Sequence, residues 1–235
     1  MFDRTAELYD LIYQNKDYAG ESAQLIQMIQ QHKRSPGNRL LEVACGTGGH
    51  IAHLRDHFSV TGMDANENMI AIARNKYPDI PFHVANMQDF DLGETFDVVT
   101  CLFSSIGYTG SEPAMREAIA AMEKHVTPGG LLIIEPWFGP GMMTDQLQTV
   151  STVEGDGIKV ARMTYTQIRG DISILSFHYL IAHPGEPIAY AEEQHKLGLF
   201  THSDYISAFQ RVDLDVVYDA EGLTGRGLYI GIRPS

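Results

Sequence analysis

The sequence has little cysteine and no long apolar run. Only Cys45 and Cys101 occur among 235 residues, and their spacing fits neither a metal site nor a disulfide framework. We expect both to be small buried side chains in a reducing compartment. No stretch of about 18 apolar residues, and no charged leader followed by an apolar segment, is present. We therefore expect a cytoplasmic protein that neither spans a membrane nor is secreted.

Basic residues are also scarce, since 17 Lys and Arg stand against 30 Asp and Glu and give a formal net charge of -13. This charge repels a polyphosphate backbone, which disfavours RNA and DNA as substrates. A small anionic ligand remains compatible, because one or two arginines are enough to bind it. His, Asp and Glu show no spacing typical of a metal site, so no metal is expected. We expect His50, His53 and His57 to face solvent.

As far as residue 137 the chain alternates helical and strand patterns. Helices are expected over 4–15, 20–33, 50–58, 67–77 and 111–125, and strands over 39–44, 59–64, 80–85, 95–103 and 129–137. Five buried strands joined by helices predict a mainly parallel sheet in an α/β fold. A helix over 203–211 is followed by strands over 213–219 and 225–232, which we expect to form a hairpin that completes a seven-stranded, Rossmann-like sheet.

Between about 148 and 200 the apolar residues alternate with a period of two, and the turn sequences GDG, RGD and PGEP separate the runs. This pattern predicts an antiparallel β meander. Because it follows the fifth strand, we expect an insertion over the carboxyl edge of the sheet, where α/β proteins bind ligands. The whole chain, 1–235, is then expected to be a single domain.

The sharpest local feature is the glycine-rich turn in LLEVACGTGGH, where an apolar strand ends and a helix begins at once. Glycines let the backbone approach a ligand closely, and the start of a helix offers free N–H groups. Asp64 ends the next strand, 18 residues after Gly46, where a carboxylate can accept hydrogen bonds from both ribose hydroxyls of an adenosine cofactor. The dinucleotide fingerprint is not met, since Ile51 replaces its third glycine, and an acidic residue, Glu42, precedes the loop.

Here the chain resembles the class I methyltransferases that use S-adenosylmethionine (SAM), whose first motif is a strand followed by Asp or Glu and then Gly-x-Gly. The resemblance implies that SAM is the cofactor and that Glu42 binds its methionine moiety, including the ammonium group. A cationic ligand also explains an acidic residue in an apolar strand. DANENMIAIA and ANMQDF are similar to the next two family segments, although Asn66 replaces serine and Ala85 and Asn86 replace Gly and Asp.

Five stretches spread from end to end carry a closer resemblance: YDLIYQNKDYA, LLEVACGTGGH, CLFSSIGY, VTPGGLLIIEPW and GLTGRGLYIGI. They are similar to the N,N-dimethyltransferases of dTDP-linked 3-amino sugars, of the desosamine and mycaminose type, which serve the biosynthesis of macrolide-type antibiotics. The resemblance implies one or two methyl transfers to the amino group of a dTDP-linked sugar, with positioning as the main source of rate. It also favours a homodimer. The segment Asn/Asp-Pro-Pro-Tyr/Phe is missing, which disfavours methylation of planar nitrogens.

The resemblance also assigns roles to individual residues. Tyr13 and Tyr18 are expected to close over SAM and the amine within a helical lid at 1–35, and Tyr13 and Tyr108 are the catalytic candidates. The cofactor residues are expected to be Tyr13, Tyr18, Glu42, Ala44, Gly46, Thr47, Gly48, Asp64, Ala65, Met69, Asn86, Met87 and Leu102. The substrate residues are expected to be Ser104, Ser105, Tyr108, Glu135, Trp137, Arg162, His178 and Arg226, with Arg226 holding the diphosphate. His195 is a further candidate for the pocket lining.

Two alternatives stay open at this point. A methyltransferase acting on the nitrogen or oxygen of another small metabolite would share the cofactor site and differ in the meander. A SAM-binding protein without turnover is the other, although such a protein has no need of the FSSIGY and GRGLY segments.

Overall fold

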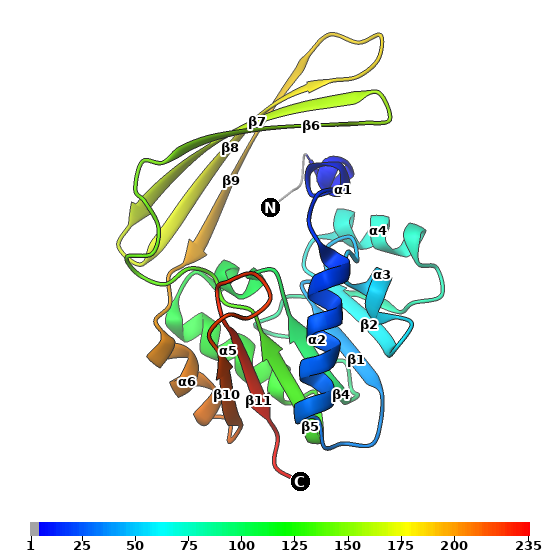
Figure 1. Cartoon of the computed structure of the whole chain (residues 1–235), viewed down its shortest axis with the longest axis vertical. Helices are drawn as coiled ribbons and strands as arrows, with labels where there is room; N and C mark the ends of the chain where they lie inside the picture. Colours follow the sequence, from blue (N-terminus) through cyan, green and yellow to red (C-terminus); the bar gives the residue numbers. More distant parts are fainter. Residues whose placement is uncertain (1–4) are drawn as a thin grey trace.

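The computed structural model describes residues 5–235, and a seven-stranded sheet forms its centre (Figure 1). The strands are β1 (Arg39–Val43), β2 (Ser59–Asp64), β3 (Phe82–Val84), β4 (Phe96–Cys101), β5 (Val126–Ile134), β10 (Asp215–Asp219) and β11 (Leu228–Ile232). They lie in the order β10-β11-β5-β4-β1-β2-β3, and β11 runs antiparallel to both of its neighbours while the other pairs are parallel. The expected C-terminal hairpin therefore completes the sheet.

Helices cover both faces of this sheet. They are α2 (Tyr18–His32), α3 (Ile51–Leu54) and α4 (Glu67–Lys76) on one face, and α5 (Glu112–Glu123) and α6 (His202–Gln210) on the other. In β4, for example, Val98 packs into the cluster that contains Leu25 of α2, whereas Val99 packs with Met115 of α5. Successive residues of a strand point to opposite faces, so burial on both sides explains why these strands are apolar throughout.

Polar side chains fix where several helices begin. Asp17 accepts a hydrogen bond from the backbone N–H of Gly20 at 2.9 Å, and Asn66 accepts two at the start of α4. At the start of α6, Thr201 and Asp204 form a reciprocal capping box. The serine-to-asparagine change noted at position 66 therefore keeps the capping function of that residue.

The ends of some expected helices differ. The first becomes a short turn of 3-10 helix, η1 (Ala6–Leu8), and one turn of α1 (Tyr9–Ile12), and its residue 4 lies outside the described part. The helix expected over 50–58 is a single regular turn, α3. A second 3-10 helix, η2 (Ser105–Thr109), was not expected, and it follows β4 at the carboxyl edge. No helix within residues 5–235 has the length and apolar character needed to cross a membrane.

The segment between β5 and α6 forms a separate antiparallel sheet of β6 (Gln148–Gly155), β7 (Ile158–Arg169), β8 (Ile172–Ala182) and β9 (Ala189–Gly198) in sequence order. It stands over the carboxyl edge of the large sheet, and α1 lies between the two sheets (Figure 1). Leu8 of η1 packs in one cluster with Phe177 and Tyr179 of β8, which joins η1 to the antiparallel sheet. The expected antiparallel insertion after the fifth strand is confirmed.

Candidate active site

A cavity of about 420 Å³ opens at the carboxyl edge of the large sheet. Its floor comes from the ends of β1 and β2, and its walls come from α1, the residues after β3 and β4, and the antiparallel sheet. Eleven of the expected site residues line it: Tyr13, Ala44, Gly46, Asp64, Ala65, Met69, Asn86, Met87, Ser105, Tyr108 and Trp137. Eight other lining residues were not expected from the sequence: Tyr9, Met63, Gln88, Phe103, Thr109, Leu175, Phe177 and Leu197.

A smaller hollow of about 30 Å³ adjoins the cavity, and the two share lining residues that include Ala44, Gly46 and Ser105. Three further expected residues, Tyr18, Glu42 and Leu102, line this smaller hollow. Glu42 and Asp64 come from the neighbouring strands β1 and β2, which pair in parallel register. The structure therefore brings the two carboxylates to one edge of the sheet, one at each of two adjoining hollows.

The glycine-rich loop has the geometry that its sequence predicts. Gly46 and Gly48 adopt left-handed backbone angles, with φ of +56° and +83°. At Gly49 an added Cβ would lie 2.5 Å from the ring of Tyr18, so only glycine lets α2 approach the loop this closely. Thr47 and Gly48 line neither hollow. The hydroxyl of Thr47 instead donates to Asp10 at 2.6 Å, which ties the loop to α1.

Both oxygens of the Asp64 carboxylate accept backbone hydrogen bonds. The N–H of Gly46 donates to one oxygen at 2.9 Å, and the N–H of Asn66 donates to the other at 2.8 Å. Burial raises the pKa of Asp64 above its usual value, although these hydrogen bonds act in the opposite direction. A carboxylate has about four lone-pair sites, so Asp64 keeps acceptor capacity for a ligand in the cavity.

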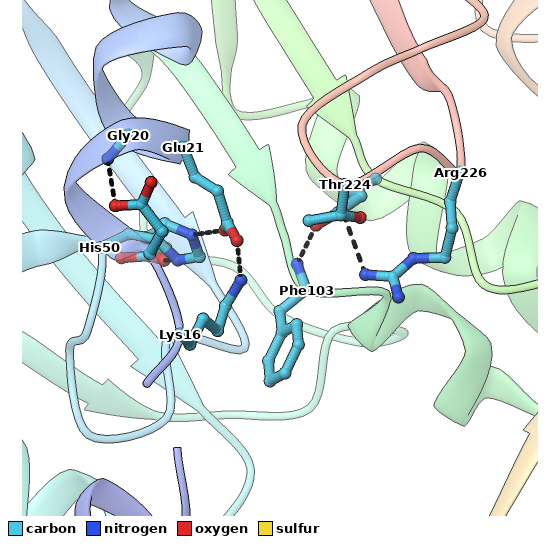
Figure 2. A network of polar contacts seen from close by, with 10 residues as sticks. Lys16, Gly20, Glu21, His50, Phe103, Thr224 and Arg226 are labelled. Atoms are coloured by element: carbon cyan, nitrogen blue, oxygen red, sulfur yellow. Dashed lines mark hydrogen bonds and ion pairs between the residues drawn. The ribbon is translucent and has the colours of Figure 1, made fainter. Parts of the chain in front are cut away.

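Buried charges connect the smaller hollow to α2, and Figure 2 shows part of this network. His50 Nδ1 lies 3.4 Å from Glu42, and His50 Nε2 lies 2.8 Å from Glu21, which also pairs with Lys16. The other Glu42 oxygen, Oε2, is buried without a hydrogen-bond partner among residues 5–235. A buried carboxylate oxygen without a donor is costly, and an ammonium group in the hollow would supply one. The free acceptor at this end therefore fits the amino-acid moiety of SAM, whose ammonium group donates hydrogen bonds.

The expectation that His50 faces solvent is wrong, because only 4% of its surface is exposed. Burial lowers the pKa of His50, but its contacts with Glu21 and Glu42 outweigh this effect and raise the pKa to about 9. The sequence held a usable signal, since His50 lies one helical turn before the buried Leu54. His53 is exposed, as expected.

Directly after β4, Phe103 and Ser104 have left-handed backbone angles, with φ of +50° and +60°. The carboxylate of Glu135 holds this corner, because it accepts the N–H of Phe103 at 2.6 Å and also binds Thr224 and Arg226 (Figure 2). Glu135 is fully buried and lines neither hollow, and the hydroxyl of Ser104 donates to a backbone carbonyl at 2.7 Å. Glu135 and Ser104 therefore hold the backbone after β4 in place without lining the cavity themselves.

The two expected arginines also lie outside the lining of both hollows. Arg226 donates to Glu135 at 3.1 Å, and its guanidinium lies over the ring of Trp137, which lines the cavity. The guanidinium of Arg162 lies 5.7 Å from the ring centre of Tyr13 and 5.1 Å from that of Phe177. Both cations are thus one side chain away from the cavity. Among the described residues, Nε and Nη1 of Arg162 have no hydrogen-bond partner.

The two histidines of the insertion lie in different surroundings. His178 points to the outer face of the antiparallel sheet, where its ring accepts or donates a hydrogen bond with Tyr190 at 2.6 Å, and the structure does not bring it to the cavity. His195 is buried, and its Nδ1 lies 2.7 Å from the hydroxyl of Tyr108. No group of three or more potential metal ligands occurs within the described 5–235.

Comparisons with known proteins agree on one family. A family model described as a methyltransferase domain matches residues 40–130. The chain is 40% identical to a dTDP-3-amino-3,6-dideoxy-alpha-D-glucopyranose N,N-dimethyltransferase of Streptomyces fradiae, over 97% of this chain and 90% of that protein. A sugar N-methyltransferase from Streptoalloteichus sp. ATCC 53650 superposes with a TM-score of 0.90 at 36% identity, over 99% and 95% of the two chains. A SAM-bound amino pentose methyltransferase from Micromonospora echinaspora superposes with 0.86 at 34% identity, over 96% of each.

Proposed function

Because the chain belongs to the family of SAM-dependent N,N-dimethyltransferases of dTDP-linked amino sugars, we propose that it methylates the amino group of a dTDP-linked amino-deoxysugar. One observation supports this most: the two adjoining hollows have an acid at each end, Glu42 and Asp64, and a wall from the antiparallel insertion. The two acids suit a cationic adenosine cofactor. The wall from the antiparallel insertion encloses the space in which a small acceptor can bind.

In the proposed complex, Glu42 accepts hydrogen bonds from the ammonium group of SAM, and Asp64 accepts them from the ribose hydroxyls. Asn86 and Met87 border the adenine, since both line the cavity and follow β3, which lies on the other side of β2 from β1 and its glycine loop. Tyr13 and Tyr18 belong to a lid formed by 1–35, of which residues 1–4 lie outside the described part. The ties from Asp10 to Thr47 and Lys76, at 2.6 and 2.8 Å, support this role because they hold α1 over the loop.

Bound SAM supplies an electrophilic methyl group on a sulfonium. Ser105, Tyr108 and Trp137 face the remaining cavity, and we assign them the acceptor amine. Holding an amine in line with the breaking bond supplies several kcal/mol of rate enhancement, and an aliphatic amine needs no strong base once it has lost a proton. Glu135 and Ser104 position this wall through the corner at Phe103. His178 is not part of the proposed site, because it faces away from it.

We assign the diphosphate to Arg226, assisted by Arg162. A planar guanidinium suits the oxygens of a phosphate, and each of these two lies against an aromatic ring of the cavity wall. Small ligand-induced rotations would bring either cation to the opening. A single domain of 1–235, a homodimer and a cytoplasmic location, where SAM and nucleotide sugars are made, stay predictions.

The proposed function is tested by incubating the full chain with methyl-labelled SAM and a dTDP-linked amino-deoxysugar, followed by mass analysis of the sugar. One or two added methyl groups on nitrogen support the proposal. Methylation of another small metabolite in preference to amino sugars would contradict the substrate class. Tight binding of SAM with no acceptor found would favour a binding protein without turnover.

A further inference from the structure

A tyrosine, a histidine and a glutamate form a chain that leads away from the acceptor side of the cavity. The hydroxyl of Tyr108 lies 2.7 Å from Nδ1 of His195, and Nε2 of His195 lies 3.7 Å from a carboxylate oxygen of Glu193. Tyr108 lines the cavity, whereas His195 is 1% exposed on β9 and does not line it. Glu193 is held by Thr5, whose backbone N–H and hydroxyl donate to it at 3.2 and 2.8 Å.

The proposed reaction needs an exit for protons. An aliphatic amine has a pKa of about 8 to 10, so at neutral pH the acceptor is mostly an ammonium ion without a lone pair. It must lose one proton before the first methyl transfer, and a second before any second transfer. The antiparallel sheet and η2 wall this side of the cavity, so a side chain there that accepts the proton would raise the rate.

Resting on the proposed function, we propose that Tyr108, His195 and Glu193 carry the proton away from the acceptor ammonium before each methyl transfer. The oxygen of Tyr108 accepts a proton from the ammonium while its own hydroxyl proton passes to Nδ1 of His195. The freed amine forms a bond to the methyl carbon of SAM, the carbon–sulfur bond breaks, and its electron pair stays on sulfur. The products are a methylated ammonium, S-adenosylhomocysteine and a His195 imidazolium. When the products leave and water enters the cavity, the imidazolium returns its proton through the hydroxyl of Tyr108 to that water.

The surroundings of Tyr108 suit a relay and not a permanent base. Burial raises the pKa of Tyr108 well above its usual value, so its hydroxyl stays protonated between turnovers. A relay through a protonated hydroxyl avoids a buried tyrosinate, which would be costly. Glu193 lies against the far nitrogen of His195 and stabilises the imidazolium that forms. Tyr9, Tyr13, Asp64 and Tyr179 also interact electrostatically with Tyr108, and none of these four is a cation.

The molecule offers matched controls for this geometry. Tyr190 forms a hydrogen bond of 2.6 Å with Nδ1 of His178 on the outer face of the antiparallel sheet, and Tyr190 is 60% exposed. Tyr190→Phe therefore removes the same kind of hydrogen bond as Tyr108→Phe. At the start of α6, His202 Nδ1 lies 2.9 Å from the hydroxyl of Tyr229, so His202→Asn is matched to His195→Asn. Neither control residue lines the cavity.

The test compares single-turnover methylation of a dTDP-linked amino-deoxysugar, at saturating SAM and sugar, from about pH 6.5 to 9.5. Asparagine at position 195 can still accept a hydrogen bond from Tyr108, but it cannot take up a proton. At pH 7 we expect Tyr108→Phe and His195→Asn to be about 10- to 100-fold slower than wild type. Above the pKa of the acceptor amine, the variants should be as fast as wild type, because the amine then binds without the extra proton and needs no relay. The two control variants should follow the wild-type pH profile.

Each other outcome has a distinct meaning. If the wild-type chain methylates no dTDP-linked amino sugar, the proposed function fails, and the relay fails with it. If wild type is active and the two variants are slower by the same factor at every pH, the chain of residues is only structural and the relay is wrong. Variants as fast as wild type would also overturn it. Should His195→Asn fail to fold, as judged by circular dichroism, Glu193→Gln replaces it, with a smaller slowing and the same recovery of the wild-type rate at high pH.

Discussion

Glu135 and Phe103 lie 32 residues apart in sequence, yet the carboxylate of one accepts the backbone N–H of the other at 2.6 Å. This bond holds Phe103 at the edge of the cavity in a left-handed backbone conformation. For a residue other than glycine, this conformation costs about 1 kcal/mol or more. The same carboxylate neutralises Arg226. One buried acid therefore links the corner after β4 to the turn before β11.

Replacing this acid should destabilise the fold. Glu135→Ala leaves Arg226 without its carboxylate and the N–H of Phe103 without an acceptor, and we expect a loss of about 3 kcal/mol in the free energy of unfolding. Urea denaturation measures it. Glu117→Ala, on the exposed side of α5, is the control and should change the value by less than about 0.5 kcal/mol. An equal effect of the two substitutions would contradict the supporting role of Glu135.

Removing the acid at the end of β2 should weaken cofactor binding. We expect Asp64→Ala to lower SAM affinity at least about tenfold, or about 1.4 kcal/mol, because charge-assisted hydrogen bonds to the ribose are lost. Isothermal titration calorimetry measures the affinity, and Asp56→Ala, an exposed aspartate after α3, serves as control. Unchanged affinity in Asp64→Ala would mean that the cofactor lies elsewhere.

Stability should depend on pH through His50. Its pKa is about 9 in the folded chain and close to 6.5 when unfolded, so its contribution is complete below about pH 6.5 and is lost as pH rises through 9. The loss is at most on the order of 3 kcal/mol. We therefore expect wild type to lose more stability than His50→Gln between these pH values in urea titrations. His53→Gln, which alters an exposed residue one turn away, should behave like wild type. Parallel curves for wild type and His50→Gln would refute the assignment.

Loss of the proposed diphosphate contact should weaken substrate binding without affecting cofactor binding. Arg226→Ala should raise the Michaelis constant for a dTDP-linked amino sugar about tenfold and leave SAM affinity unchanged. Arg226→Lys should recover only part of the loss, since an ammonium lacks the planar fork. Arg211→Ala, at an exposed position after α6, is the control. If neither constant changes in Arg226→Ala, this arginine does not bind the diphosphate.

Periodic features of the fold were predictable from the sequence. Apolar runs such as LLEVA and FDVVTC gave the parallel strands, and alternation between 148 and 200 gave the antiparallel sheet, because burial on two faces or on one leaves a regular pattern. The glycine loop and Asp64 follow from local geometry in the same way. The family resemblance added Tyr108 and Trp137, which periodicity alone does not distinguish from core residues.

Partners chosen across the fold were not predictable. The spacing of His50 to Leu54 indicates that His50 is buried, but nothing near it in sequence shows that Glu21, 29 residues away, is its partner. The corner at Phe103 and Ser104 has left-handed backbone angles without a glycine, and its support, Glu135, directly follows another strand, β5. His195 and Tyr108 are 87 residues apart in sequence, and they become partners only when the insertion folds back over η2. Such pairings depend on tertiary structure and leave no periodic trace.

The most direct measurement is a crystal structure of the full chain with S-adenosylhomocysteine and dTDP. We expect the amino group of S-adenosylhomocysteine to lie within about 3 Å of Glu42 and its ribose hydroxyls to donate to Asp64. The diphosphate of dTDP should lie beside Arg226. Adenosine bound elsewhere, or protein atoms filling the hollow beside Glu42, would show that Glu42 and Asp64 do not form the cofactor site.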